Sequence, residues 1–125
     1  MDMTNLGGKT NSGIGAGTGV KALSVPRLDP VFSYPVEGGD IFVYLLRTEV
    51  AKIVVITFDD TSDEYAFAVQ TLTSNSKYEA VELVRNAEKT YNNFEGENPF
   101  SQLYEDLDAM GKLAHILAEF YNSGE

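Results

Sequence analysis

The runs DIFVYLLR at residues 40–47 and KIVVITFD at residues 52–59 decide the fold of this chain. Both are rich in β-branched and aromatic side chains, which favour strands. Only residues 48–51 separate them, and a third run, YAFAVQTL at residues 65–72, follows an acidic turn. Connections this short favour antiparallel pairing of neighbouring strands. The sequence therefore predicts a three-stranded antiparallel β-meander.

The faces of these predicted strands differ in polarity. The third run alternates, and the pattern places every second residue on one face: Tyr65, Phe67, Val69 and Thr71. The first two runs are apolar on both faces. Because a pair of helices covers only one face of such a sheet, the other face needs a cover of its own. Three covers remain open: the proline-bearing segment 25–36, a second copy of the chain, or a foreign partner.

Two helices are predicted after the strands. Ser76 and Glu79 fit a capping box at the start of the first helix. Asn98 fits the N-cap of the second helix, with Pro99 at its first position, and apolar residues keep helical spacing from there almost to the end of the chain. Gly111, inside the second helix, indicates close packing at that point. The predicted fold class is therefore α+β.

The first part of the chain has a different composition. Six of the eleven glycines fall within residues 1–24, among Ser, Thr and Asn. Such a segment buries too little apolar surface to fold alone, so we predict a flexible arm. Pro26, Pro30 and Pro35 then stiffen an extended segment along the domain surface. The predicted organisation is a Gly-rich arm, residues 1–24, and a single α+β domain, residues 25–125.

Composition excludes several classes of protein. The chain has no cysteine, which excludes disulfides, thiolate metal sites and cysteine nucleophiles. No apolar run approaches the ~18–20 residues of a membrane span, and the N-terminus lacks the basic and apolar regions of a secretion signal. We expect a cytoplasmic protein without membrane contact, found in the host cytoplasm or the virion if its source is viral.

The net charge of −10 is unevenly distributed along the chain. Residues 1–52 carry five basic and five acidic side chains, whereas the remainder carries four basic and fourteen acidic ones. Negative charge repels phosphate backbones, so binding to duplex nucleic acid is disfavoured. The acidic surface either keeps the protein soluble or faces a partner.

The sequence offers little for catalysis or for cofactor binding. The glycine run at residues 13–19 lacks the spacing of a dinucleotide-binding loop. His115 is the only histidine, and a lone histidine cannot build a multi-histidine metal site. The acidic turn lacks the glycine and the glutamate of an EF-hand loop. We therefore predict a protein that is not an enzyme and that uses no cofactor or metal.

Three functions remain, and each is a contact with a partner. The first is a subunit of a multi-subunit particle, viral particles included, which binds a protein or a second copy of itself through the arm and the apolar sheet face; its candidate residues are Ile14, Val20, Leu23, Phe42 and Tyr44. The second is an acidic inhibitor that imitates nucleic-acid phosphates and blocks a basic site on another protein. Its candidate groups are the carboxylates of residues 95–108 and those of Asp59, Asp60, Asp63 and Glu64. The third is binding of single-stranded nucleic acid by strand aromatics, Phe67 among them.

Overall fold

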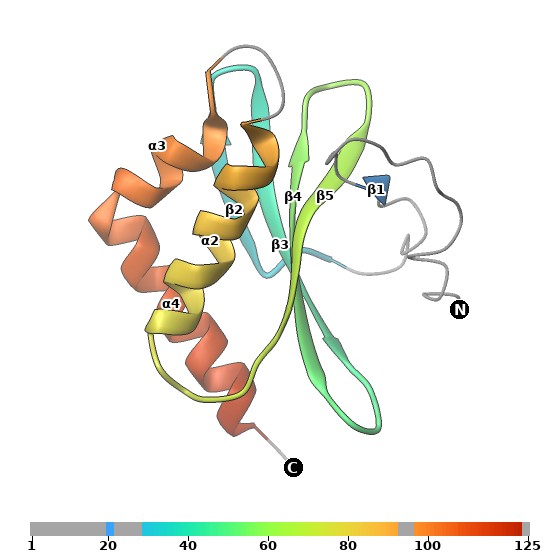
Figure 1. The fold of residues 1–125 in the computed structure, drawn as a ribbon, viewed down its shortest axis with the longest axis vertical. Helices are drawn as coiled ribbons and strands as arrows, with labels where there is room; N and C mark the ends of the chain where they lie inside the picture. The colour runs from blue at the N-terminus through green and yellow to red at the C-terminus, as the bar shows by residue number, and fades with distance from the viewer. Residues whose placement is uncertain (1–19, 22–28, 93–96, 124–125) are drawn as a thin grey trace.

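The computed structural model describes residues 20–21, 29–92 and 97–123 of the chain. Its sheet has the spatial order β1-β5-β4-β3-β2, and all neighbouring strands are antiparallel (Figure 1). The predicted meander is its centre, because three long strands pair in chain order. The strands are β1 (Val20–Lys21), β2 (Phe32–Val36), β3 (Gly39–Arg47), β4 (Lys52–Asp59) and β5 (Glu64–Thr71).

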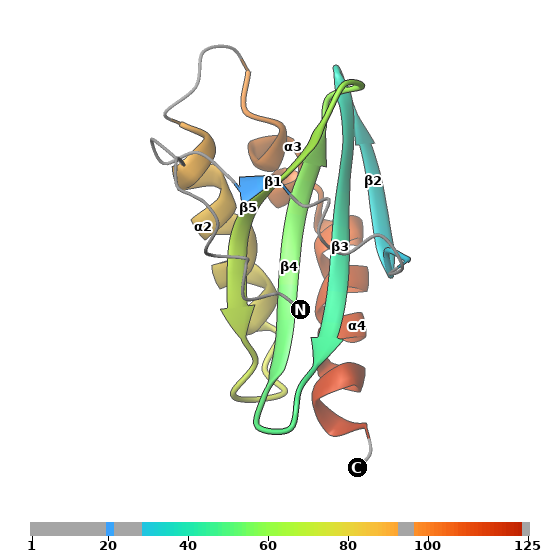
Figure 2. The same cartoon turned by 90° about the vertical axis from the view of Figure 1, so that its right-hand side faces the viewer.

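The helices of the described residues pack on one face of this sheet (Figures 1 and 2). The α+β class is confirmed, but the sheet has more strands than predicted and the C-terminal part holds three helices instead of two. The helices are α2 (Tyr78–Tyr91), α3 (Pro99–Glu105) and α4 (Leu107–Asn122).

Part of the proline-bearing segment becomes an edge strand of the sheet. Phe32 lies opposite Val43 in the register of β2 and β3, and Pro35 lies opposite Asp40. Proline is tolerated there because an edge strand can lack one ladder donor. Gly38, with a φ of 95°, closes the turn that leads into β3. Residues 32–36 therefore extend the sheet at its edge, as strand β2, instead of lying across its face.

The predicted alternation of the third strand is wrong at its centre. The register between β4 and β5 shifts between Ile56 and Thr57, which inserts Phe67 as an extra residue. A bulge of this kind reverses the alternation of the side chains that follow it. Phe67 is therefore buried among the helices, whereas Val69 is 58% exposed on the other face.

The first helix begins differently from a capping box. The Ser76 hydroxyl accepts a hydrogen bond from the Tyr78 backbone N–H at 2.9 Å, which satisfies one donor of the first turn. The Glu79 carboxylate does not return to Ser76. It reaches further back and accepts the backbone N–H groups of Thr73 at 3.0 Å and Ser74 at 2.9 Å. The N-cap of α2 is Lys77, one residue after the predicted Ser76, so the predicted capping box is not formed.

The second predicted helix is two helices separated by Asp106. This residue is extended, with φ −92° and ψ 98°, and its side chain caps α4 by accepting the Ala109 N–H at 3.1 Å. Its second oxygen accepts the hydroxyl of Tyr34 from edge strand β2 at 2.8 Å. The predicted cap at Asn98 is confirmed, because its side chain accepts the Phe100 N–H at 3.0 Å.

Gly111 does not mark close packing, and that expectation is wrong. It is exposed on α4, and a methyl group built on it would meet no described atom within 4 Å outside the helix's own backbone. The tight glycine of the described chain is Gly39, where a methyl group would collide with the carbonyl oxygen of Asp59. Close approach of β3 and β4 therefore requires glycine at residue 39.

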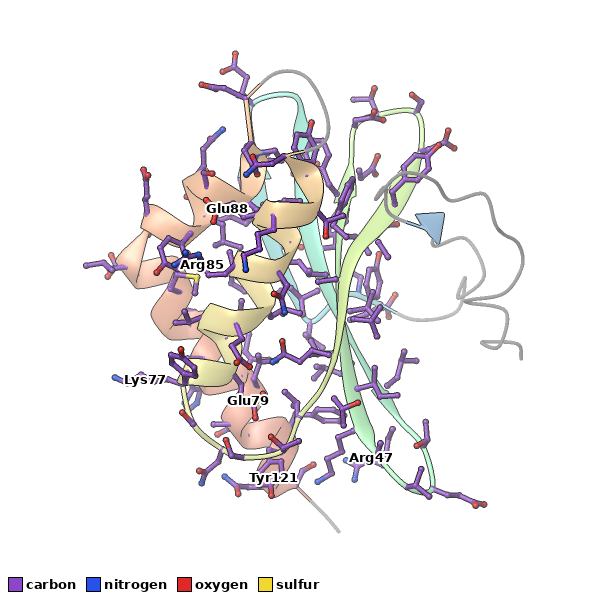
Figure 3. All side chains as sticks on the ribbon, in the orientation of Figure 1. Arg47, Lys77, Glu79, Arg85, Glu88 and Tyr121 are labelled. Atoms are coloured by element: carbon purple, nitrogen blue, oxygen red, sulfur yellow. The ribbon has the colours of Figure 1, made fainter. Side chains whose placement is uncertain are left out.

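The end of α4 is fastened to the hairpin between β3 and β4. The Lys52 ammonium donates to the carbonyl oxygens of Tyr121 at 2.8 Å and Ser123 at 2.7 Å. Arg47 donates to the Ser123 hydroxyl at 2.8 Å, and Figure 3 shows Arg47 and Tyr121 at the same end of the molecule. Cations at a helix C-terminus stabilise its unpaired carbonyl groups. These contacts orient the helix layer against the sheet.

Candidate interaction surface

The two faces of the sheet have separate roles, which follow from the alternation of β3 and β4. Ile41 and Val43 on β3 point toward the helices and are fully buried, as are Val54 and Ile56 on β4. Residues between them point to the opposite side. We call this side the outer face and define its apolar part by five residues: Phe42, Leu46, Ile53, Val55 and Val69.

The outer face carries large apolar side chains although the described helices lie on the other side of the sheet (Figures 1 and 2). Phe42, Leu46, Ile53 and Val55 are partly exposed, and Val69 is exposed. Aliphatic and aromatic side chains gathered on one surface are typical of a contact site. Phe42 was predicted as a contact residue; the other four residues were not singled out.

A polar group of three side chains crosses the outer face from β3 to β5. The Tyr44 hydroxyl donates to Glu64 Oε2 at 2.5 Å, and the Thr57 hydroxyl donates to the same oxygen at 2.6 Å. Tyr44 is 8% exposed and Thr57 is fully buried. The structure thus brings together Tyr44 and Glu64, which the sequence had assigned to two different functions.

The chemistry of this polar group is structural and not catalytic. Burial, together with the hydrogen bond and the charge of Glu64, raises the pKa of Tyr44 above its ordinary value. The phenol therefore stays protonated and acts as a donor, which is the opposite of what a general base needs. Both hydroxyl groups end on one carboxylate oxygen, which fixes β3, β4 and β5 relative to one another.

The acidic turn between β4 and β5 uses two of its carboxylates to hold itself. Asp60 Oδ1 accepts the backbone N–H groups of Ser62 at 3.1 Å and Asp63 at 3.3 Å. These backbone hydrogen bonds lower the pKa of Asp60. Asp59 accepts the N–H of Thr61 at 2.9 Å, and Thr61 has a φ of 87°. Asp59 and Asp60 are therefore turn-forming residues, whatever else they contact.

The predicted contact residues of the arm are placed only in part. Val20 pairs with Ala66 and Lys21 pairs with Tyr65, so two residues of the predicted arm form β1 beside β5. Ile14 and Leu23 lie outside the described residues.

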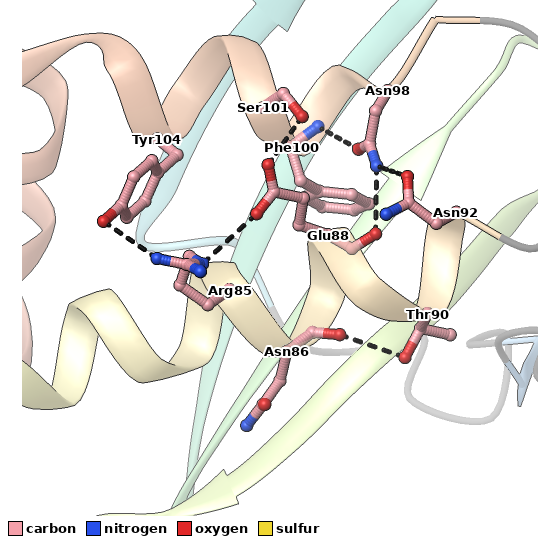
Figure 4. Close-up of polar contacts among 9 residues, drawn as sticks. All are labelled: Arg85, Asn86, Glu88, Thr90, Asn92, Asn98, Phe100, Ser101 and Tyr104. Carbon is pink, nitrogen blue, oxygen red and sulfur yellow. Dashed lines mark hydrogen bonds and ion pairs between the residues drawn. The ribbon is translucent and has the colours of Figure 1, made fainter.

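A second polar cluster joins α2 to α3 (Figure 4). Arg85 lies over the ring of Tyr104, 5.1 Å from its centroid, and pairs with Glu88 at 3.4 Å. Glu88 also accepts the Ser101 hydroxyl at 2.7 Å, and Asn98 donates to the Glu88 carbonyl oxygen at 2.9 Å. These groups bond to one another across the helix pair. The cluster is accounted for by helix packing and needs no ligand.

Glu79 is the one charged residue that is buried among the described residues (Figure 3). Besides the two backbone donors, its carboxylate accepts Gln70 Nε2 at 2.9 Å and the hydroxyls of Thr73 at 3.0 Å and Ser74 at 3.2 Å. Burial would raise the pKa of Glu79, but the hydrogen bonds outweigh it and lower the pKa. A carboxylate that accepts this many hydrogen bonds has a structural role, because it connects α2 to the end of β5.

The described part of the chain holds neither a metal-binding cluster nor a membrane-spanning helix. Within residues 29–92 and 97–123, no three His, Asp or Glu side chains gather closely enough to hold a metal ion. No helix of the described ranges is long and apolar enough to cross a bilayer. His115 pairs with Glu119 at 3.3 Å on the exposed side of α4, as the helical spacing predicts.

Comparison with protein-family models, curated protein sequences and solved structures finds no match for this chain. Function is therefore inferred from the surface of the molecule alone.

Proposed function

We propose that the protein is a non-enzymatic assembly subunit that docks on another protein chain through its outer face. The observation that carries this proposal is the set of apolar side chains on the face that the described helices leave uncovered: Phe42, Leu46, Ile53, Val55 and Val69. Burial of apolar surface is the main favourable term in protein association. A multi-subunit particle, with the N-terminal arm as a second contact, fits the composition of residues 1–24.

The polar group beneath this surface supports a binding role. The hydroxyl groups of Tyr44 and Thr57 donate hydrogen bonds to the Glu64 carboxylate. These bonds stabilise a charged group on an otherwise apolar face. A face that is rigid before binding loses less conformational entropy when a partner docks. The two cross-strand hydrogen bonds therefore suit a preformed docking surface.

An acidic inhibitor is less well supported. Such an inhibitor needs carboxylates that point outward and are available to a basic site. Asp59 and Asp60 instead accept bonds from the backbone of their own turn, and Glu64 is bonded to Tyr44 and Thr57. The carboxylates of Asp59, Asp60 and Glu64 thus already accept hydrogen bonds within the chain.

Replacing Leu46 with aspartate tests the proposal. Leu46→Asp puts a charge on the apolar contact, so the dissociation constant of the assembly should rise at least about tenfold. Mass from light scattering coupled to size-exclusion chromatography, at about 0.05 and 0.5 M salt, checks this result. The wild-type assembly should persist at the higher salt, because apolar burial is not screened.

The matched control is Val50→Asp, which makes the same kind of change at a turn residue that is 91% exposed. Val50→Asp should leave the assembly unchanged. An assembly that dissolves in salt and ignores Leu46→Asp would contradict the proposal and favour the acidic inhibitor.

A further inference from the structure

The two edges of the sheet are not equivalent. Strand β2 at one edge is short and contains Pro35, which cannot donate to a further strand. Strand β5 at the other edge is longer, and β1 pairs only with Tyr65 and Ala66 near its start (Figure 2). Beside Ala68–Thr71, on the side away from β4, the described residues place no further strand.

The uncovered part of β5 lacks the features that protect sheet edges. Natural edges carry lysine, proline or inward charges that prevent pairing with another chain. Residues 65–76 contain no charged residue and no proline, in a chain with nineteen acidic and nine basic side chains. Val69 and Thr71 are exposed there. Among the residues that the structure describes, this part of β5 thus has no strand partner on its outer side and carries no charge, in a strongly acidic protein.

The structure itself shows that this edge accepts a strand. Val20 and Lys21 pair with β5 in antiparallel orientation, opposite Ala66 and Tyr65. A second strand of the same orientation, placed further along β5, would continue the ladder in the direction of Thr71.

The helix beside the edge, α2, carries both charged and uncharged polar side chains on the side that faces β5. Glu79 contacts Gln70 and Thr73, so this side of α2 faces the end of β5. Asn86 lies seven residues further and so on the same side of the helix. Figure 4 shows Asn86 and Thr90 on the side of α2 opposite Arg85. The flank of the edge is therefore uncharged at Asn86 and Thr90, whereas Glu82 adds one acidic side chain to the same stripe of the helix.

We propose that a second copy of this chain pairs with the β5 edge at Ala68–Thr71, antiparallel and about a two-fold axis, so that two sheets form one continuous sheet. An isologous contact brings the same strand from both copies together, and like charges facing each other across a ladder are destabilising. An uncharged strand in a chain of net charge −10 avoids this penalty. The contact uses the edge backbone, so it goes beyond the proposed docking on the outer face.

Thr71→Glu tests the edge contact, with Ser33→Glu as its matched control. Both positions are exposed strand residues and both changes add one negative charge, but Ser33 lies on β2 at the opposite edge. Sedimentation equilibrium at about 0.5 M salt, where repulsion between the acidic chains is screened, measures the dimer. Wild type and Ser33→Glu should dimerise equally, and Thr71→Glu should raise the dimer dissociation constant at least about tenfold.

Hydrogen exchange keeps the test decisive if Thr71→Glu perturbs folding. In the wild-type protein, backbone amides of residues 68–71 should exchange more slowly as concentration rises, whereas those of β2 should not change. A wild-type chain that stays monomeric to about 1 mM would overturn the proposal. So would a dimer that survives Thr71→Glu, or a dimer that Ser33→Glu weakens as much as Thr71→Glu does. A dimer that is lost in Leu46→Asp but kept in Thr71→Glu would overturn the edge contact and leave the outer-face proposal standing.

Discussion

Glu79→Gln should lower the free energy of unfolding by about 2–4 kcal/mol. The carboxylate accepts from two backbone N–H groups, two hydroxyls and the Gln70 amide, and it is 6% exposed. Glutamine keeps one acceptor oxygen but turns an NH₂ group toward donors, which leaves buried N–H groups unpaired. Urea denaturation followed by circular dichroism measures the change.

The same residue gives the protein a stability that depends on pH. The pKa of Glu79 is lower in the folded chain than its ordinary value of 4.5. A group with a depressed folded pKa adds stability that is present above the unfolded pKa and is lost as the pH falls through the folded pKa. The free energy of unfolding of the wild type should therefore decrease as the pH drops below about 4.5. The decrease should be less steep for Glu79→Gln.

Glu82→Gln is the matched control, because Glu82 is exposed on the same helix. It should change the free energy of unfolding by no more than about 0.5 kcal/mol. Equal effects of the two substitutions would show that the network around Glu79 does not stabilise the fold.

Phe100→Ala should cost about 3–5 kcal/mol of stability. Phe100 is fully buried where α3 meets the sheet. Its ring lies 5.5 Å from that of Phe67, 6.0 Å from that of Tyr91 and 6.4 Å from that of Phe58. Alanine would remove one side of this aromatic cluster and leave a cavity that the sheet cannot collapse to fill.

Leu107→Ala serves as the control for Phe100→Ala. Leu107 lies just after α3 and is 81% exposed, so its truncation should change stability by no more than about 0.5 kcal/mol. Thermal and urea unfolding of both variants compare the two. A Phe100→Ala protein as stable as Leu107→Ala would mean that α3 is not anchored by its aromatic ring.

Local signals in the sequence predicted most of the regular structure. Strand β4 has the predicted bounds, and the Asn98 cap with Pro99 is confirmed, because β-branched runs and cap residues act over a few neighbouring residues. Strand β2 was missed because Pro35 argues against a strand, and only its edge position makes proline acceptable. The helix break at Asp106 was missed because apolar spacing continues across it, although aspartate is a common N-cap.

The candidate surface was only partly predictable, because it depends on the register of the paired strands. Tyr44 and Glu64 were both singled out, but their contact depends on how β3, β4 and β5 align, which no local pattern specifies. Val69 was assigned to the same face as Phe67 because the bulge at residues 56–57 cannot be read from strict alternation. Its position on the outer face emerges only from the paired strands.

Carbene footprinting of the concentrated and diluted protein tests the central claim, docking through the outer face, most directly. This measurement reads side-chain exposure residue by residue. Labelling of Leu46, Ile53 and Val55 should fall on assembly, while that of exposed Leu107 should stay constant. Protection confined to the acidic turn at residues 59–63, with the outer face labelled equally in both states, would contradict the account.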